Sequence, residues 1–169
     1  LIPLGRNNAN EAGIGLDAEE RFSGGVIRII PSVQSALFPQ REHKRFSDTI
    51  FIRSLRGNRM GVAFDFKGDG FAAEGQLSIL SEIIAVGDIQ MTGDGRPFVL
   101  LPECQTTGGY PRIGTVIPAD LPKLAQTAPG KEVSFQMITL PEALDVQKSF
   151  EDDIKRLSER ASPLIRDPS

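Results

Sequence analysis

The stretch IIAVGDIQMTGDGRPFVLL (residues 83–101) decides the fold class of this chain. Two apolar runs, at residues 89–91 and 98–101, flank a short polar segment that contains Asp94 and Gly95. An Asp-Gly pair between two apolar runs is a strong short-range signal for a β-hairpin, because these residues tolerate the backbone of a tight turn. The stretch therefore predicts two antiparallel strands.

Further strand signals lie on both sides of this hairpin. Short apolar runs, most of them close to a Gly or Pro, predict strands at residues 26–30, 49–53, 61–66, 113–117 and 132–138. Helical signals are confined to short pieces at 35–46 and 118–126 and to a longer run after Thr139, where Thr139 and Glu142 have the spacing of a capping box. We therefore expect an all-β fold: a mostly antiparallel barrel or sandwich with one or two short helices and a C-terminal helix packed on it.

Composition narrows the classes of function. The chain has 169 residues, enough for one domain with a core, and a formal net charge of -3. A nearly balanced charge gives no electrostatic reason to expect nucleic acid or a membrane surface as a partner. The one cysteine and one histidine exclude an internal disulfide and a metal site built from several Cys or His ligands, so no metal is expected. This cysteine usage favours a reducing compartment, and we expect a cytoplasmic protein.

The sequence lacks the residues expected of a phosphate-binding loop and of a cysteine nucleophile with a nearby base. Gly130-Lys131 is followed by Glu132 and not by the Ser or Thr of a phosphate-binding loop. Cys104 as a nucleophile would have only the distant His43 as an imidazole base, so a small buried or loop thiol is the simpler interpretation.

Residues 105–115 concentrate polar groups directly after an apolar strand. Six consecutive residues carry or expose hydrogen-bonding groups: Gln105, Thr106, Thr107, Gly108, Gly109 and Tyr110. Adjacent glycines let a backbone approach a ligand closely, and exposed N–H groups with hydroxyls can surround an oxyanion, a carboxylate or a phosphate. Arg112 would add a bidentate charge. The alternative is a tight strand connection in which the hydroxyls satisfy the backbone.

Two shorter segments carry similar signals. Arg59 stands between Gly57 and Gly61, where short turns would hold it as an anion clamp; the alternative is a hairpin turn with a solvated Arg. Gln90 lies between Ile89 and Met91, in the strand that leads into the hairpin turn. A Gln at a barrel mouth can orient an amide, whereas the alternation of the strand alone favours an outward-facing polar position.

These segments resemble a known family in their order and spacing. The matching stretches are RIIPSVQ (28–34), NRMG (58–61), LSE (80–82), GDIQ (87–90), GRPFVLL (95–101) and residues 105–121, of which QTTGGYP (105–111) is the most specific. Over about residues 26–144 the chain resembles the allophanate hydrolase subunit 2 family. That family is also described as subdomains A and B of the urea carboxylase carboxyltransferase domain, or as the C component of bacterial 5-oxoprolinase.

The resemblance implies a cyclophilin-like β-barrel and a division of the chain. Family members are about twice as long, and the match is to their C-terminal half. Residues 1–25 are then a linker or arm from a missing N-terminal half, residues 26–138 the barrel, and residues 139–169 a C-terminal helix and tail. The implied partners are the subunit 1 protein, the missing N-terminal half and a small amide substrate bound where the pieces meet.

The resemblance also implies a function. The chain would be part of an ATP-dependent lactam hydrolase acting on 5-oxoproline, or of a biotin-dependent carboxyltransferase acting on urea or a similar amide. ATP or carboxybiotin would belong to the assembled complex, and the fragment alone is expected to be inactive. A rival is a regulatory binding module that holds an inhibitor of a sensor kinase.

Roles for individual residues follow from the same resemblance. Donors to a developing oxyanion would come from Thr106, Thr107, Gly109 and Tyr110, a positive charge from Arg59, and amide orientation from Gln90 and Gln105. Gly108 and Arg112 complete the expected substrate-binding set, and no general base is identified. Two departures from the family are notable: Asp88 replaces a small residue, and Glu103-Cys104 replaces Asp-Arg.

Overall fold

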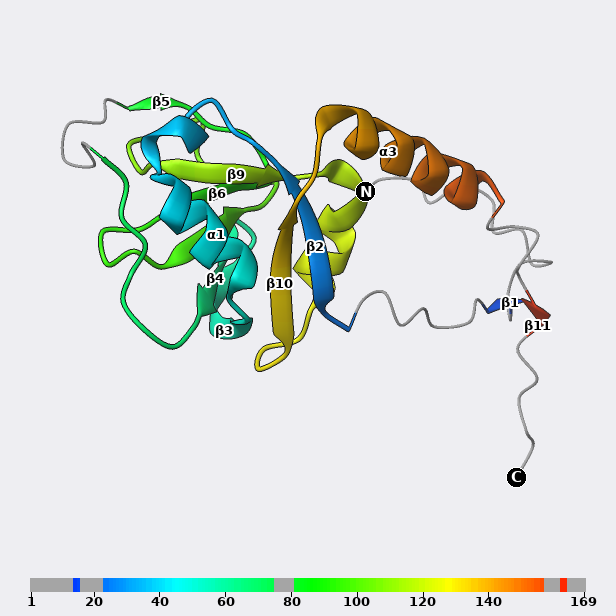
Figure 1. Ribbon diagram of the computed structural model, residues 1–169. Helices are drawn as coiled ribbons and strands as arrows, with labels where there is room; N and C mark the ends of the chain where they lie inside the picture. Colours follow the sequence, from blue (N-terminus) through cyan, green and yellow to red (C-terminus); the bar gives the residue numbers. More distant parts are fainter. Residues whose placement is uncertain (1–13, 16–22, 75–80, 157–161, 164–169) are drawn as a thin grey trace.

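The computed structural model describes residues 14–15, 23–74, 81–156 and 162–163 (Figure 1). Its centre is a closed barrel with the strand order β10-β2-β9-β6-β7-β4-β3. The barrel strands are β2 (Gly25–Ile30), β3 (Phe51–Asn58), β4 (Gly61–Asp65), β6 (Asp88–Met91), β7 (Pro97–Leu100), β9 (Arg112–Val116) and β10 (Glu132–Met137). Six of the seven neighbouring pairs are antiparallel and only β10–β2 is parallel. The predicted all-β class and the mostly antiparallel barrel are confirmed.

The predicted hairpin is formed by β6 and β7. The N–H of Gly95 donates to the carbonyl of Thr92 at 2.8 Å, and Gly95 has a φ of 71°. A Cβ there would lie 2.4 Å from the backbone nitrogen of Phe71, so only glycine fits. The hydroxyl of Thr92 donates to the Asp94 carboxylate and lowers the pKa of Asp94. The turn is thus fixed by one glycine and by the Thr92 hydroxyl, which also donates to the Arg96 carbonyl at 2.9 Å and accepts from the Arg96 N–H at 3.2 Å.

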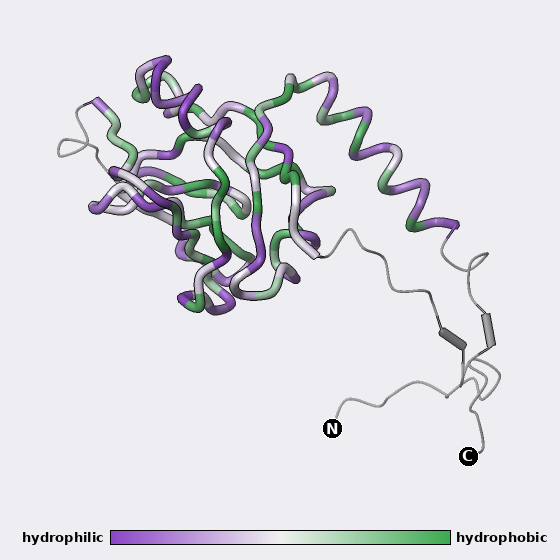
Figure 2. The backbone as a smooth tube through the Cα atoms, turned by 60° about the horizontal axis from the view of Figure 1, so that its bottom comes forward, coloured by the Kyte–Doolittle hydropathy of each residue, from purple (hydrophilic) through white to green (hydrophobic). Residues whose placement is uncertain are grey.

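Aromatic side chains fill the barrel. Phe51 on β3, Phe64 on β4 and Phe135 on β10 are fully buried, and α1 (Gln40–Asp48) inserts Phe46 among them. The Phe46 ring stacks on Phe135 with 5.1 Å between centroids. Each buried Phe contributes about 1.5–3 kcal/mol by leaving water. Figure 2 shows the same division along the backbone, with hydrophobic residues in the barrel strands and a mainly hydrophilic α1.

The C-terminal helix is α3 (Leu140–Lys155), and its capping box is as predicted. The Thr139 N–H donates to Glu142 Oε2 at 2.7 Å, and the Glu142 N–H donates to Thr139 Oγ1 at 3.4 Å. Ala143, Val146 and Phe150 form one apolar cluster with Ile117 and Ala119, which follow strand β9. In Figure 1 the helix continues past the barrel at its C-terminal end. The short helices are η3 (Ser35–Leu37), η5 (Pro118–Asp120) and α2 (Leu121–Gln126).

Two short ribbons lie outside the barrel sheet. In one, β5 (Glu82–Ile83) pairs with β8 (Thr107–Gly108), and in the other β1 (Ile14–Gly15) pairs with β11 (Ser162–Pro163). Most of the expected N-terminal arm (1–13 and 16–22) and much of the tail (157–161 and 164–169) lie outside the described residues. The division at residues 25 and 138 stays a prediction.

Within the described ranges, no helix has the length and apolar character needed to cross a membrane.

Candidate amide-binding site

One pocket of about 270 Å³ brings together most of the residues that the sequence analysis selected. Its walls come from the β3–β4 turn, from β6 and β7, from Ile84 beside β5, and from the segment that leads into and follows β8. The lining residues are Asn58, Met60, Ile84, Gln90, Phe98, Leu100, Cys104, Gln105, Gly108, Gly109 and Tyr110. None of these residues is an Asp, Glu, Lys, Arg or His.

Gln90 is the central polar group of the pocket. It lies on β6 opposite Phe98, and only 7% of it is exposed. Its neighbours Ile89 and Met91 belong to the barrel core, so Gln90 faces out of the barrel, as the strand pattern favours, but it is covered there by β8 and not by solvent. Among the described residues, no side chain or backbone group forms a hydrogen bond with its carboxamide, which borders the pocket. Its Oε1 and Nε2 are not among the enclosed polar atoms without a partner, so they stay accessible from the pocket and can pair with a ligand there.

Gly108 allows β8 to approach Gln90. A Cβ on Gly108 would lie 2.6 Å from Gln90 Nε2 and 3.3 Å from Ile84 Cγ2. Any side chain here would displace the carboxamide from its position in the pocket. The first glycine of the pair is thus explained by close packing against a polar group.

Thr106 and Thr107 hold the ribbon and do not line the pocket. Thr107 pairs with Ile83 in β5, and the Thr106 carbonyl accepts from the Ile84 N–H at 3.1 Å. Both threonine residues are exposed. Of the donors expected in this segment, the structure brings the Gly109 backbone and Tyr110 to the pocket, together with Gln105.

Arg59 lies in the β3–β4 turn, between two lining residues, but does not line the pocket itself. Its side chain is 84% exposed, and its Nε lies 3.0 Å from Glu103 Oε2. The Glu103 N–H also donates to the Arg59 carbonyl at 3.2 Å. This ion pair joins the turn to the segment that carries Cys104, on the solvent side of the lining.

Arg112 does not line the pocket, so it is not placed to bind an anion there directly. Its guanidinium is buried and forms ion pairs with Asp88 at 3.1 Å and with Glu82 at 2.8 Å. It also donates to the Ile83 carbonyl at 2.8 Å and to Gln34 Oε1 at 3.2 Å. These interactions hold β5 against β9. The guanidinium therefore supports the wall of the pocket but does not line it.

Asp88, the charge that departs from the family pattern, belongs to the same network. Its carboxylate accepts from Arg112, from the Thr115 hydroxyl at 2.6 Å and from the Ala85 N–H at 2.9 Å. Three donors compensate the burial of this carboxylate. The charge of Asp88 is thereby neutralised inside the fold and leaves the pocket neutral.

Several lining residues were missed by sequence reasoning. Asn58 and Met60 flank Arg59 within the NRMG motif, and Cys104 directly precedes Gln105, so position beside a motif was the available signal. Phe98 and Leu100 alternate on β7 and were expected only as part of an apolar strand of the hairpin. The thiol of Cys104 is half-buried. Across the described ranges, no group of three His, Cys, Asp or Glu residues could hold a metal ion.

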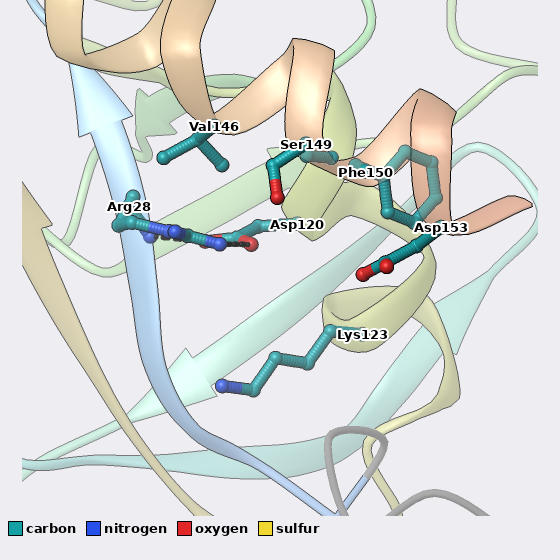
Figure 3. A pocket seen from close by; sticks show the side chains of 8 residues that line it. Arg28, Asp120, Lys123, Val146, Ser149, Phe150 and Asp153 are labelled. Carbon is teal, nitrogen blue, oxygen red and sulfur yellow. Dashed lines mark hydrogen bonds and ion pairs between the residues drawn. The ribbon is translucent and has the colours of Figure 1, made fainter.

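A second hollow, of about 230 Å³, lies between α3 and the barrel (Figure 3). Here the hydrogen bonding between β2 and β9 ends, and side chains bond to the unpaired backbone edge of β2. Asp120 accepts from the Arg28 N–H at 2.7 Å and pairs with its guanidinium, an interaction that raises the pKa of Arg28. Lys123 Nζ donates to the Val26 carbonyl at 2.7 Å. Asp120 and Lys123 thereby bond to the backbone edge of β2 that β9 leaves unpaired.

The fold and the pocket define a closed β-barrel protein with an uncharged binding pocket. Comparison with known proteins gives the family. The chain matches the family model of the carboxyltransferase domain, subdomain A and B, over residues 2–137. It is 33% identical over 135 residues to the C component of 5-oxoprolinase from Haemophilus influenzae, covering 78% of this chain and 43% of that protein. It is 34% identical over 160 residues to the Escherichia coli protein of the same name, covering 92% and 51%.

A solved structure agrees with the fold. The urea amidolyase of Kluyveromyces lactis superposes with a TM-score of 0.69 at 19% identity, covering 86% of this chain and 10% of that chain. The chain therefore belongs to the carboxyltransferase domain, subdomain A and B family. It spans about half the length of the curated relatives that it matches.

Proposed function

We propose that this chain is a substrate-binding part of an amide-hydrolysing assembly of the 5-oxoprolinase type. The observation that carries the proposal is the buried Gln90 carboxamide, which borders a neutral pocket and has no partner among the described residues. A carboxamide offers a donor and an acceptor on the same edge, which is the complement of another amide. The curated relatives at 33% and 34% identity, both named as the C component of 5-oxoprolinase, support this choice over urea.

The chemistry proposed for the pocket is recognition and stabilisation of charge. When water or an activated group attacks an amide, negative charge develops on the carbonyl oxygen. Donors fixed beforehand stabilise this charge without reorganising. The backbone of Gly108–Gly109 and the hydroxyl of Tyr110 are the proposed donors, while Gln90 and Gln105 orient the amide.

In this proposal the general base and the ATP site are not part of this chain. The described lining holds no carboxylate or imidazole to act as general base, and no cation to meet the phosphates of ATP. We therefore assign the general base and the ATP site to the rest of the protein or to a subunit 1 partner. The chain by itself is expected to be inactive.

The test is ATP turnover by the intact protein mixed with its subunit 1 partner, with and without 5-oxoproline. Stimulation by 5-oxoproline is expected, together with at least a tenfold loss of kcat/KM in Gln90→Leu. The matched control is Gln136→Leu, a Gln on strand β10 whose side chain is exposed. A tight complex without substrate-dependent turnover would contradict the proposal and support the regulatory module. Turnover that requires a biotin carrier and urea would support the carboxyltransferase.

A further inference from the structure

We infer that the pocket takes only the uncharged edge of its ligand, a cis amide such as that of a lactam, and leaves a carboxylate of the ligand at the rim. At the rim, the carboxylate of the ligand replaces Glu103 as the ion-pair partner of Arg59. This inference rests on the proposed function and assigns the orientation of the ligand and the residue that meets its carboxylate.

The first step is the neutrality of the interior. Every described lining residue is apolar, an amide, a thiol, a phenol or a glycine. Arg112, the buried cation behind β5, is already paired with Asp88 and Glu82. A carboxylate inside the pocket would gain no cation for the hydration that it loses, and the neutral donors proposed for the pocket would offset this loss only in part. A neutral group has no such cost.

The second step is the geometry of Gln90. Its carboxamide presents C=O and N–H₂ side by side. An amide whose own C=O and N–H lie on the same side can form two hydrogen bonds with it at once. In a trans amide these groups point in opposite directions, so only one bond can form. Five-membered lactams and primary amides have the required edge, and the walls of Met60, Phe98 and Leu100 suit the methylene groups of a ring.

The third step is the Arg59–Glu103 pair at the rim. Arg59 stands between the lining residues Asn58 and Met60, and Glu103 directly precedes the lining residue Cys104. Both side chains are exposed, at 84% and 53%, so their mutual attraction is weak. A carboxylate on a bound ligand can therefore replace Glu103 at little cost. Glu103 in turn competes with the anion for Arg59.

The experiment is a binding measurement on the intact protein, by calorimetry or ligand-observed NMR, with three probes. The probes are 5-oxoproline, 2-pyrrolidone (the same lactam without a carboxylate) and cyclopentanecarboxylate (a carboxylate without an amide). We expect 5-oxoproline to bind more tightly than 2-pyrrolidone and cyclopentanecarboxylate to bind least. Gln90→Leu should weaken both lactams at least tenfold.

The rim is tested by three variants. Arg59→Gln should bring the affinity for 5-oxoproline down to that for 2-pyrrolidone, whose binding stays unchanged. Glu103→Gln should strengthen 5-oxoproline alone, by about twofold to fivefold. Arg56→Gln is the matched control, because Arg56 forms a similar exposed ion pair with Asp65 and should change neither lactam.

The outcomes separate this inference from the proposed function. If the assembly turns over 5-oxoproline but Arg59→Gln leaves the ratio of the two lactam affinities unchanged, the inference is wrong and the proposed function stands. If the binding profile is as expected but no ATP-dependent hydrolysis occurs, the inference stands and the proposed function is wrong. Failure of the wild-type protein to bind either lactam, or preference for cyclopentanecarboxylate, overturns the inference.

Discussion

At position 108 a single methyl group would occupy the space beside the Gln90 carboxamide. A Cβ there would lie 2.6 Å from Gln90 Nε2, the end of a flexible side chain, so Gly108→Ala is expected to turn Gln90 away and not to unfold the chain. We predict at least a tenfold weaker binding of 5-oxoproline with little change in the urea denaturation midpoint. Gly93→Ala is the control, because nothing lies within 4 Å of a Cβ there. Equal affinity in the two variants would contradict the prediction.

Asp94 gives a prediction of pH dependence. The Thr92 hydroxyl lowers the pKa of Asp94 in the folded chain, so the carboxylate stabilises the fold. This contribution is complete above the unfolded pKa of about 3.9 and is lost as the pH falls through the lower folded value. Asp94→Asn should therefore be less stable than wild type at pH 7, and the difference should narrow below about pH 4. Urea denaturation across this range measures it, and a constant difference would contradict it.

Residue positions were only partly predictable from sequence. The motif at 105–110 does lie beside Gln90, and a Gly-Gly pair after a strand is a signal of such close approach. The position of Arg112 was not predictable, because its acceptors Gln34, Glu82 and Asp88 are 78, 30 and 24 residues away in the sequence. An Arg beside a ligand-like motif gives the same sequence signal whether it faces a ligand or a buried carboxylate.

Among the elements, β5 depends on Arg112. Removal of this side chain would leave the buried Asp88 carboxylate without its cation and β5 without its anchor. We predict that Arg112→Ala lowers the free energy of unfolding by about 3–5 kcal/mol. It should also speed hydrogen exchange at the Ile84 N–H, which bonds to Thr106. Arg56→Ala, in an exposed pair, should cost no more than about 1 kcal/mol. Equal losses in the two variants would contradict this assignment.

The start of α3 gives a second prediction at this scale. Thr139 caps the helix, and its hydroxyl lowers the pKa of Glu142. Thr139→Ala should destabilise the chain by about 1 kcal/mol, because the Glu142 N–H loses its acceptor. Thermal denaturation followed by circular dichroism measures this loss. An unchanged midpoint would show that α3 is held by Ala143, Val146 and Phe150 alone.

Elements with local signals were the predictable ones. The β6–β7 hairpin and the capping box of α3 are encoded within a few residues, and both are confirmed. The parallel pairing of β10 with β2 and the pairing of β5 with β8 join segments far apart in the sequence. Such pairings depend on closure of the whole barrel, which no local pattern encodes. For the same reason the sequence left a barrel and a sandwich open as alternatives.

For the molecule as a whole, one edge of β2 is incompletely paired, because β2 pairs with β9 only at Ile29 and Ile30. Lys123 donates to the Val26 carbonyl there, so Lys123→Ala would free one acceptor of this edge. We predict concentration-dependent self-association of Lys123→Ala, detected by light scattering at little cost in stability. Lys148→Ala is the control, because it removes the same charge from α3, away from this edge. Equal scattering by the two variants would contradict the prediction.

The pairing of Asp120 and Lys123 with β2 thus has a consequence for solubility. An unpaired strand edge is a template on which a second chain can add, and repeated addition leads to aggregates. Here an anion accepts from the Arg28 N–H and a cation donates to the Val26 carbonyl, so an incoming strand would have to displace two charged groups. The chain can therefore keep an incomplete sheet contact without becoming a seed for fibres.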